Sequence, residues 1–299
     1  MKDRQVSEKL MIIAIVASMF LWGLSWPSAK VLTHYSSAIN FVVYRYIIVV
    51  VSLFLLLVCS GGKLRISKNG APIVVLAGIL LCGYSYLFFM GLKNGSPGAG
   101  GVLVTILNPI MAYTLGVIID RKLPGRNEAV GLGLGILAGS ILLQLWSATS
   151  SIFDSGNIYF LLAATTWAVM SKFTSKGAQY GSSAGFSLWQ YVTTLLCLLP
   201  MTDFHEMRLA LGIKDTVFWF NLFFSSAIVT TLATTMYFYA TTWLGAEKAS
   251  SFIFLVPMAA AVSSWLLLSE RILPHTIIGG ALGMAAVYMI NKKPRSAMR

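Results

Sequence analysis

The stretch LMIIAIVASMFLWGLSWPSAKVL, residues 10–32, contains a single charged side chain, that of Lys30. A helix needs about 20 mostly apolar residues to cross the hydrocarbon core of a bilayer, so this stretch predicts a membrane-spanning helix. A cleavable signal peptide would have a shorter apolar run that ends in a small-residue cleavage site. Because this run is long and has no such site, we expect it to remain in the protein as the first span.

Ten apolar segments of this kind follow one another along the chain. They lie at 10–32, 38–60, 71–92, 97–119, 127–146, 156–177, 184–201, 216–240, 247–268 and 274–291. Most gaps between them are short and carry turn residues such as Gly61 and Gly62. The longest gap, 202–215, mixes apolar with charged residues, and we expect it to lie along the membrane interface. The expected fold class is an all-α polytopic membrane protein with ten transmembrane helices.

Composition and charge argue against a nucleic-acid-binding protein. Hydrophobic residues make up 57% of the chain and charged residues 11%, and the formal net charge is +12. In a soluble protein such a charge would suggest a nucleic-acid partner. Here the basic residues stand in short gaps between apolar runs, where they meet anionic lipid head groups. We therefore expect membrane lipids as partners and no nucleic acid.

The distribution of Lys and Arg predicts the orientation in the membrane. With the N-terminus inside, sixteen of these residues flank the spans on the cytoplasmic side and four on the outer side. Short cytoplasmic loops carry the excess of positive charge in membrane proteins. We expect both termini in the cytoplasm, and the protein in the bacterial cytoplasmic (inner) membrane.

The two halves of the chain resemble each other in sequence. The matched pairs are Trp22 with Trp167, Tyr35 with Tyr180, Ser37 with Ser182, Phe41 with Phe186 and Tyr46 with Tyr191 at a shift of 145 residues, and Leu107 with Leu255, Pro109 with Pro257, Gly131 with Gly279 and Gly135 with Gly283 at a shift of 148. This ordered set predicts a five-helix unit used twice, in residues 1–148 and 149–299. Because five is odd, the second copy enters the membrane from the opposite side, as in the inverted repeats of many secondary transporters.

Several short motifs recur in the same order in both halves. The informative stretches are Leu21-Trp22-Gly23-Leu24-Ser25-Trp26-Pro27, Tyr44-Arg45-Tyr46, Ile106-Leu107-Asn108-Pro109 with Asp120-Arg121-Lys122, and Leu255-Val256-Pro257 with Ser269-Glu270-Arg271. Over nearly its whole length the sequence resembles the ten-helix EamA-type transporters of the drug/metabolite transporter superfamily. The resemblance implies a secondary transporter, commonly an exporter of amino acids or other metabolites, with a central cavity lined by helices 1, 3, 4, 6, 8 and 9. Met170-Ser171-Lys172 departs from the Ser-Trp-Pro of the first repeat, which puts symmetry at the cavity in doubt.

Arg45 is the charged residue most deeply placed in a predicted span. Ionisable groups inside the membrane are costly and suggest function, and a guanidinium can bind a substrate carboxylate in bidentate fashion. The alternative is structural, because an arginine can also snorkel or bond backbone carbonyls to fix helix packing. No Asp or Glu lies near the centre of a predicted span, which lowers the weight of a cation efflux pump.

The other candidate substrate-binding residues are aromatic or uncharged polar side chains. Aromatic rings provide flat apolar walls with a polar edge and can face an ammonium group, whereas many Trp and Tyr residues form interfacial belts instead. With Arg45, the candidates are Trp22, Trp26, Tyr86, Asn108, Tyr113, Trp167, Trp189, Gln190, Tyr239 and Ser250.

Proline and glycine residues predict where helices bend and where they pack closely. Pro27, Pro109 and Pro257 each remove a helical hydrogen bond, and we predict hinge or gate elements there, with static packing kinks as the alternative. Glycine-rich stretches in 127–146 and 274–291 favour close helix approach. We expect these two helices to form a scaffold, and a monomer in preference to a dimer.

Together these features favour export of amino acids or related zwitterions by alternating access, through a cavity between the two repeats. Uptake of such a metabolite and efflux of a cationic drug are the alternatives among carriers. A membrane-embedded enzyme would need a nucleophile–base pair or a metal cluster, and neither these nor a cofactor motif is evident, so we expect no catalytic residue, metal or cofactor. An ion channel would need a charged ring or a carbonyl filter, and neither is evident.

Overall fold

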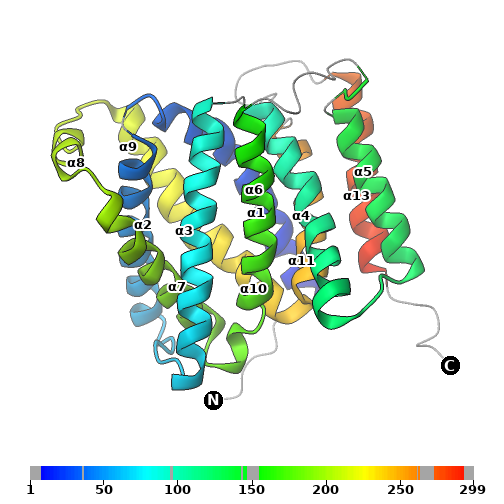
Figure 1. Cartoon of the computed structure of the whole chain (residues 1–299), viewed down its shortest axis with the longest axis horizontal. Helices are drawn as coiled ribbons and strands as arrows, with labels where there is room; N and C mark the ends of the chain where they lie inside the picture. The colour runs from blue at the N-terminus through cyan, green and yellow to red at the C-terminus, as the bar shows by residue number, and fades with distance from the viewer. Residues whose placement is uncertain are drawn as a thin grey trace.

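The computed structural model describes residues 8–35, 37–94, 97–142, 144–146, 155–260, 262 and 273–292. Within these ranges every regular element is a helix, and the helices run side by side in one bundle (Figure 1). The predicted all-helical class is confirmed for this part of the chain.

The helices follow the predicted apolar segments closely. The first half contains α1 (Glu8–Leu32), α2 (Ala38–Cys59), the 3₁₀ turn η1 (Lys68–Gly70), α3 (Ala71–Asn94), α4 (Pro97–Asp120) and α5 (Arg126–Leu142). The second half contains α6 (Ser155–Thr174), η3 (Gly177–Gln179), α7 (Ser183–Leu198), η4 (Leu199–Met201), α8 (Phe204–Ala210), α9 (Thr216–Phe223), η5 (Phe224–Thr234), α10 (Thr235–Leu244), α11 (Ala246–Ser251), η6 (Phe252–Leu255) and α13 (Pro274–Asn291).

Six stretches of helix in the described residues are long and apolar enough to cross a membrane. They are Lys9–Leu32, Ile39–Cys59, Lys68–Asn94, Gly100–Asp120, Ser183–Met201 and Thr216–Leu244. Each coincides with a predicted span. Helices α5, α6 and α13 coincide with three further predicted segments, and the predicted segment 247–268 extends past residue 262, outside the described ranges.

Helices α5 and α13 pack along each other at one side of the bundle (Figure 1). A Cβ atom at Gly131 would lie 2.5 Å from Cγ1 of Ile290, and one at Gly279 would lie 2.6 Å from Cγ of Leu142. The start of each helix thus meets the end of the other, and the two helices are antiparallel. The close approach predicted from the glycines is confirmed, and it joins two helices of the same chain.

Helix α3 packs against both α6 and α7, and α1 packs against η5 and α9. Gly91 of α3 faces the ring of Phe160 in α6, and Gly78 faces Thr193 in α7. Contacts between helices far apart in the sequence therefore build the centre of the bundle.

The segment 202–215 contains the short helix α8 at one corner of the bundle (Figure 1). Phe204 and Leu209 of this helix are exposed, while Asn40 of α2 donates to Oε2 of Glu206 at 2.9 Å. An apolar exposed face and a polar attachment to the bundle are the features expected of a helix at the membrane interface.

The predicted span 216–240 is longer and less regular than expected. Its central part, η5, is a π-helix, and α9 and α10 extend it on either side to Leu244. The hydroxyls of Thr230, Thr231 and Thr234 each donate to the carbonyl five residues earlier, at 2.9, 3.2 and 3.2 Å. π-Helical turns are rare and often mark functional sites, and hydropathy alone does not reveal them.

The three predicted proline hinges behave differently in the structure. Helices α1 and α4 continue as α-helices through Pro27 and Pro109. The helix before Pro257 changes to the 3₁₀ turn η6, which ends at Leu255. A local change of helix type is therefore found at Pro257, in accord with the hydrogen bond that proline removes; hinge motion at these three sites stays a prediction.

Gly23→Ala tests a close approach between the backbone of α1 and the backbone near Ala260. A Cβ atom at Gly23 would lie 2.6 Å from the backbone nitrogen of Ala260, which cannot rotate away as a side chain can. We expect overpacking to destabilise the protein by about 1–3 kcal/mol, measured as thermal unfolding in detergent. Gly133→Ala is the matched control, because nothing lies within 4 Å of its added Cβ. Equal melting temperatures for the two variants would contradict this packing.

Candidate functional site

A cavity lies at the centre of the bundle, where helices of both halves meet. Its lining comprises Trp22, Ser25, Trp26, Ala29, Arg45, Tyr46, Leu81, Tyr84, Phe88, Val104, Thr105, Asn108, Trp167, Tyr191, Ser225, Val229, Thr230, Thr234, Ile253 and Val256. These residues come from α1, α2, α3, α4, α6, α7, η5, η6 and the residue after it. The lining thus includes the six helices that the family resemblance implies, and adds α2 and α7.

The cavity is small. Its volume is about 70 Å³, which is enough to hold water in a polar site.

Arg45 forms the positively charged end of the cavity. Its Nε donates to Oγ1 of Thr230 at 2.9 Å, and its Nη2 donates to the same oxygen. The guanidinium carbon lies 5.9 Å from the centre of the Phe89 ring. In the part of the chain that the structure describes, no carboxylate lies within ion-pair distance of Arg45. Because a guanidinium has five N–H donors, Arg45 retains donors for an anionic ligand.

Aromatic rings form the middle of the cavity. Trp22 and Trp167 meet edge to face with ring centres 5.2 Å apart, Tyr84 lies 4.6 Å from Trp167, and Trp26 lies 4.9 Å from Phe88. The indole nitrogen of Trp22 donates to Oγ1 of Thr234 in the π-helix at 3.2 Å. The rings hold one another in position and present broad apolar faces.

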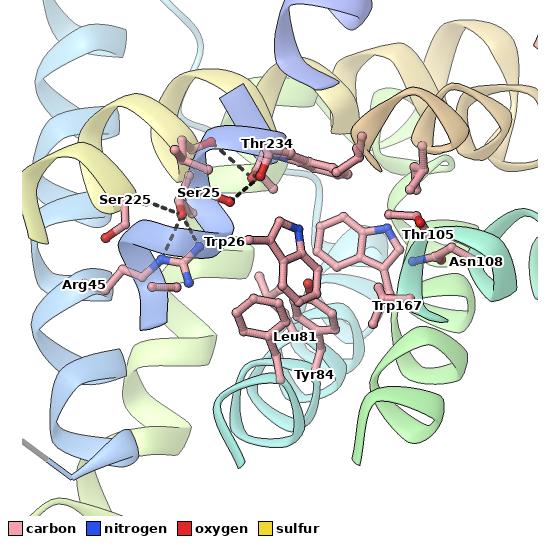
Figure 2. Close-up of a pocket in the computed structure, with 18 of the residues that line it drawn as sticks. Ser25, Trp26, Arg45, Leu81, Tyr84, Thr105, Asn108, Trp167, Ser225 and Thr234 are labelled. Carbon is pink, nitrogen blue, oxygen red and sulfur yellow. Dashed lines mark hydrogen bonds between the residues drawn. The ribbon is translucent and has the colours of Figure 1, made fainter. Parts of the chain in front are cut away.

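Asn108 and Thr105 of α4 lie at the end of the cavity opposite Arg45, with Trp26, Tyr84 and Trp167 between the two ends (Figure 2). The Thr105 hydroxyl donates to its own helix, to the carbonyl of Val102 at 3.0 Å. Asn108 is 2% exposed, and its Oδ1 has no hydrogen-bond partner among the described residues. Asn108 therefore lines the far end of the cavity while its side-chain oxygen is buried without a partner in the described part of the chain.

Five of the eleven predicted binding residues line this cavity: Trp22, Trp26, Arg45, Asn108 and Trp167. The other six, Tyr86, Tyr113, Trp189, Gln190, Tyr239 and Ser250, lie outside its lining. The structure thus brings together the candidates from α1, α2, α4 and α6, and their role in substrate binding stays a prediction.

The contacts of the six excluded residues explain their positions. Trp189 is 45% exposed and donates to the Leu64 carbonyl, as a residue near the membrane surface does. Gln190 is buried between helices and accepts from Thr174 at 3.3 Å, and Ser250 donates to a carbonyl of its own helix. Tyr86 follows Tyr84 by two residues, which places it about 200° around α3. Tyr113 is buried and Tyr239 partly buried, both away from the lining.

Sequence reasoning missed several lining residues, of which some had a detectable signal. Leu81, Tyr84 and Phe88 follow the i, i+3, i+7 spacing of one helix face, so a search for one aromatic face on α3 would have found Tyr84. Thr230 and Thr234 had no such signal, because they reach the cavity through a π-helix whose residues do not follow the 3.6-residue period.

An ion-pair network connects helices α4, α6 and α11 at one end of the bundle. The ammonium of Lys172 in α6 pairs with Asp120 at the end of α4 and with Glu247 of α11, the latter at 2.5 Å. The three side chains are partly buried, and ion pairs near a surface contribute more as a network than singly. These three residues were not among the sequence candidates, since their pairing joins positions 52 and 75 residues apart.

A hydrogen bond joins the segment after α1 to the start of α9 at the opposite end of the bundle. The hydroxyl of Tyr35 donates to Oδ2 of Asp215 at 2.5 Å, and Oδ1 of Asp215 accepts from the backbone N–H of Val217 at 2.8 Å. These two bonds hold the pKa of the Asp215 carboxyl below its usual value. Asp215 therefore caps α9 and anchors Tyr35.

The sequence of this chain is similar to those of known transporter proteins. The profile of the EamA-like transporter family matches residues 9–144 and 154–292. The uncharacterized transporter YoaV of Bacillus subtilis is 24% identical over 93% of this chain and 95% of its own, and a WAT1-related chloroplastic protein of Arabidopsis thaliana is 26% identical over 93% and 68%. A probable amino-acid metabolite efflux pump of Salmonella typhimurium is 21% identical over 90% of both chains.

A solved crystal structure shares the fold, with a TM-score of 0.71 at 16% sequence identity, over 94% of this chain and 97% of the other. The arrangement of helices is thus one that another protein of known structure also adopts.

Trp167→Ala tests whether the aromatic cluster holds the cavity together. Trp167 is 4% exposed and contacts Trp22, Tyr84 and Tyr237, so we expect a loss of about 3–5 kcal/mol in the free energy of unfolding. Trp146→Ala is the control, because Trp146 is 68% exposed and its loss should change stability by no more than about 0.5 kcal/mol. Thermal unfolding of both variants in detergent would measure the difference, and similar melting temperatures would refute the role of Trp167.

Proposed function

Because the chain belongs to the EamA-like transporter family, we propose that this integral membrane protein is a secondary transporter that exports amino acids or related zwitterions from the cytoplasm. The observation that carries the proposal is the position of Arg45, a cation at one end of an aromatic cavity. The Salmonella typhimurium relative, which is named a probable amino-acid metabolite efflux pump, adds support.

A substrate carboxylate supplies the negative counter-charge that the guanidinium of Arg45 lacks among the described residues. A guanidinium inside a membrane protein is costly without a counter-charge, and within the described residues its hydrogen-bond partner is the neutral hydroxyl of Thr230. A carboxylate matches the guanidinium fork with two parallel bonds. The aromatic rings beside Arg45 suit the apolar side chain of an amino acid and can also face its ammonium group.

Alternating access between two inverted repeats, 1–148 and 149–299, is the mechanism that we propose. Helix α1 packs against η5, and α6 packs against α3, so the contacts of the first and third helices of one half are repeated with the halves exchanged. Likewise α2 packs against α7, and α5 against α13. The family profile also matches one segment in each half. Such symmetry allows a bundle to open toward either face around a central site.

The Lys172 network then closes the cytoplasmic end of the cavity. It joins α4 of the first half to α6 and α11 of the second, so the ends of these helices cannot separate while both ion pairs are intact. Entry of substrate from the cytoplasm requires that Lys172 releases at least one carboxylate. We place both termini on this same cytoplasmic side, in the bacterial inner membrane, and the transporting unit is a single chain.

Cationic drug efflux is the weaker candidate. No Asp or Glu appears among the residues that line the cavity in the described ranges, so a cationic substrate would find Arg45 and no counter-charge. Uptake in place of export depends on the gradients across the membrane and uses the same site. An ion channel would give non-saturable conductance, which transport assays distinguish from carrier exchange.

Arg45→Gln tests the carboxylate site. In proteoliposomes, the wild-type protein should exchange a radiolabelled amino acid for the same amino acid in saturable counterflow, with a panel of amino acids used to find the substrate. Loss of charge-assisted hydrogen bonds worth about 1.5–3 kcal/mol should raise KM about ten- to hundredfold in Arg45→Gln. Arg45→Lys keeps the charge and should lose less.

The control for Arg45→Gln is its folding, checked by size-exclusion chromatography and melting temperature. Unchanged KM in correctly folded Arg45→Gln would remove the carboxylate role. Conductance that does not saturate would refute the carrier itself.

Lys172→Gln tests the cytoplasmic closure. With the native cysteines replaced by serine and a reporter cysteine at Thr105, a charged maleimide applied to the cytoplasmic side should label this variant several-fold faster, because two ion pairs are lost. Lys176→Gln is the matched control, since Lys176 is exposed and has no salt bridge in the described part of the chain. Equal labelling rates in the two variants would show that the network does not close the cavity.

A further inference from the structure

We infer that a groove between α8 and the connection from α1 to α2 binds the head group of a membrane lipid, and that this lipid carries a primary ammonium group, as phosphatidylethanolamine does. The groove shares no lining residue with the central cavity. The inference therefore does not depend on which solute the protein transports, and a failure of amino-acid counterflow leaves it in place.

The groove has the size of a site for a small organic group. Its lining comprises Thr33, His34, Tyr35 and Ser37 from the connection between α1 and α2, and Glu206, Leu209, Ala210 and Ile213 from α8 and the residues after it. Its volume is about 460 Å³, and sites for small molecules commonly measure about 300–1,000 Å³. A lipid head group fits within this space.

Both walls of the groove are fixed to the bundle. Asn40 of α2 donates to Oε2 of Glu206 at 2.9 Å and accepts from the backbone N–H of Asp203 at 3.0 Å, which attaches α8. On the other wall, the hydroxyl of Tyr35 donates to Oδ2 of Asp215 at 2.5 Å. The groove is therefore preformed, and binding does not have to order its walls.

The charge of the groove favours an ammonium group. Glu206 contributes a carboxylate, and no Lys or Arg lines the groove in the described ranges. Glu206 is exposed and forms no ion pair with a described residue. Because a carboxylate has about four acceptor positions and one accepts from Asn40, Glu206 retains acceptors for charge-assisted hydrogen bonds from a primary ammonium.

The same charge distinguishes between lipid head groups. The quaternary ammonium of phosphatidylcholine has no N–H to donate, and phosphatidylglycerol has no ammonium. The phosphate of phosphatidylethanolamine can accept from the hydroxyl of Ser37, which makes no capping bond to α2. Phosphatidylethanolamine is therefore the lipid that uses both polar walls.

The surroundings of the groove favour a lipid over a free amine. Helix α8 lies at one corner of the bundle (Figure 1), and Phe204, Leu209 and Leu211 are between 61% and 64% exposed. Exposed apolar side chains on a short helix suit the boundary between head groups and acyl chains. Leu209 is one of these side chains and also lines the groove. A head group in the groove thus leaves its acyl chains beside apolar surface.

The test measures lipid binding to the delipidated protein in detergent by native mass spectrometry. The probes are phosphatidylethanolamine, phosphatidylcholine and phosphatidylglycerol with identical acyl chains. Phosphatidylethanolamine should bind about two- to fivefold more tightly than the other two, as expected for one exposed ion pair. Equal binding of the three lipids overturns the inference. Displacement of phosphatidylethanolamine by an equal concentration of glycerophosphoethanolamine, which lacks acyl chains, overturns the choice of a lipid over a free zwitterion.

Glu206→Gln removes the charge, keeps an oxygen that accepts from Asn40, and should abolish the preference for phosphatidylethanolamine. Glu128→Gln is the matched control and should keep the preference, because Glu128 also accepts a hydrogen bond through Oε2, from the backbone N–H of Gly125, and lies outside the groove. Size-exclusion chromatography and melting temperature check that both variants fold. A preference that persists in folded Glu206→Gln overturns the assignment of the groove.

Leu209→Trp provides a second test that leaves Glu206 in place and decides the matter if Glu206→Gln does not fold. The larger side chain narrows the groove and should lower binding of phosphatidylethanolamine to the level of phosphatidylcholine. Leu211→Trp is its control, because Leu211 is equally exposed and lies outside the lining. Equal binding of phosphatidylethanolamine by these two variants overturns the inference.

Discussion

The hydrogen bonds between the Arg45 guanidinium and Thr230 fix the charged end of the central cavity, and the proposed recognition of a carboxylate depends on that position. Hydration is lost in such a place, so every hydrogen bond to the guanidinium gains in importance. The hydrogen bonds to Thr230 hold the guanidinium in one orientation at the wall of the cavity. The centre of the Phe89 ring lies 5.9 Å from the guanidinium carbon, within the range of a cation–π contact. What remains is a set of donors that face the cavity, and a cation that an incoming carboxylate can neutralise.

The π-helical segment η5 makes this arrangement possible. In η5 the threonine hydroxyls bond to carbonyls five residues earlier. Thr230 and Thr234 both reach the cavity, where Thr230 accepts from Arg45 and Thr234 accepts from Trp22. The charged end and the aromatic middle of the cavity are thus held by one irregular stretch of one helix. Irregular helical backbone is tolerated in membranes where it is buried in protein or lines a cavity, and both conditions are met here.

Polar contacts join the two halves of the chain at both ends of the bundle. At one end, Lys172 joins α4, α6 and α11 through two carboxylates, and at the other end Tyr35 and Asp215 join the segment after α1 to α9. The free energy needed to break an ion-pair network differs from that needed to break a single hydrogen bond. A carrier that alternates between two faces needs closures that can each be broken, and ion pairs near the membrane surface meet this condition because water can replace the partners.

The order of apolar segments along the chain was sufficient to predict an all-helical membrane protein, the approximate bounds of the helices, and the candidate status of Arg45, Trp22 and Trp167, because hydropathy and helix length are properties of contiguous residues. The pairing of Arg45 with Thr230, the burial of Asn108 at the cavity and the Lys172 network were decided only by the tertiary structure. Each of these features depends on contacts between segments that are far apart in the sequence. Because η5 is a π-helix, the 3.6-residue spacing that places residues on one helix face does not apply to it.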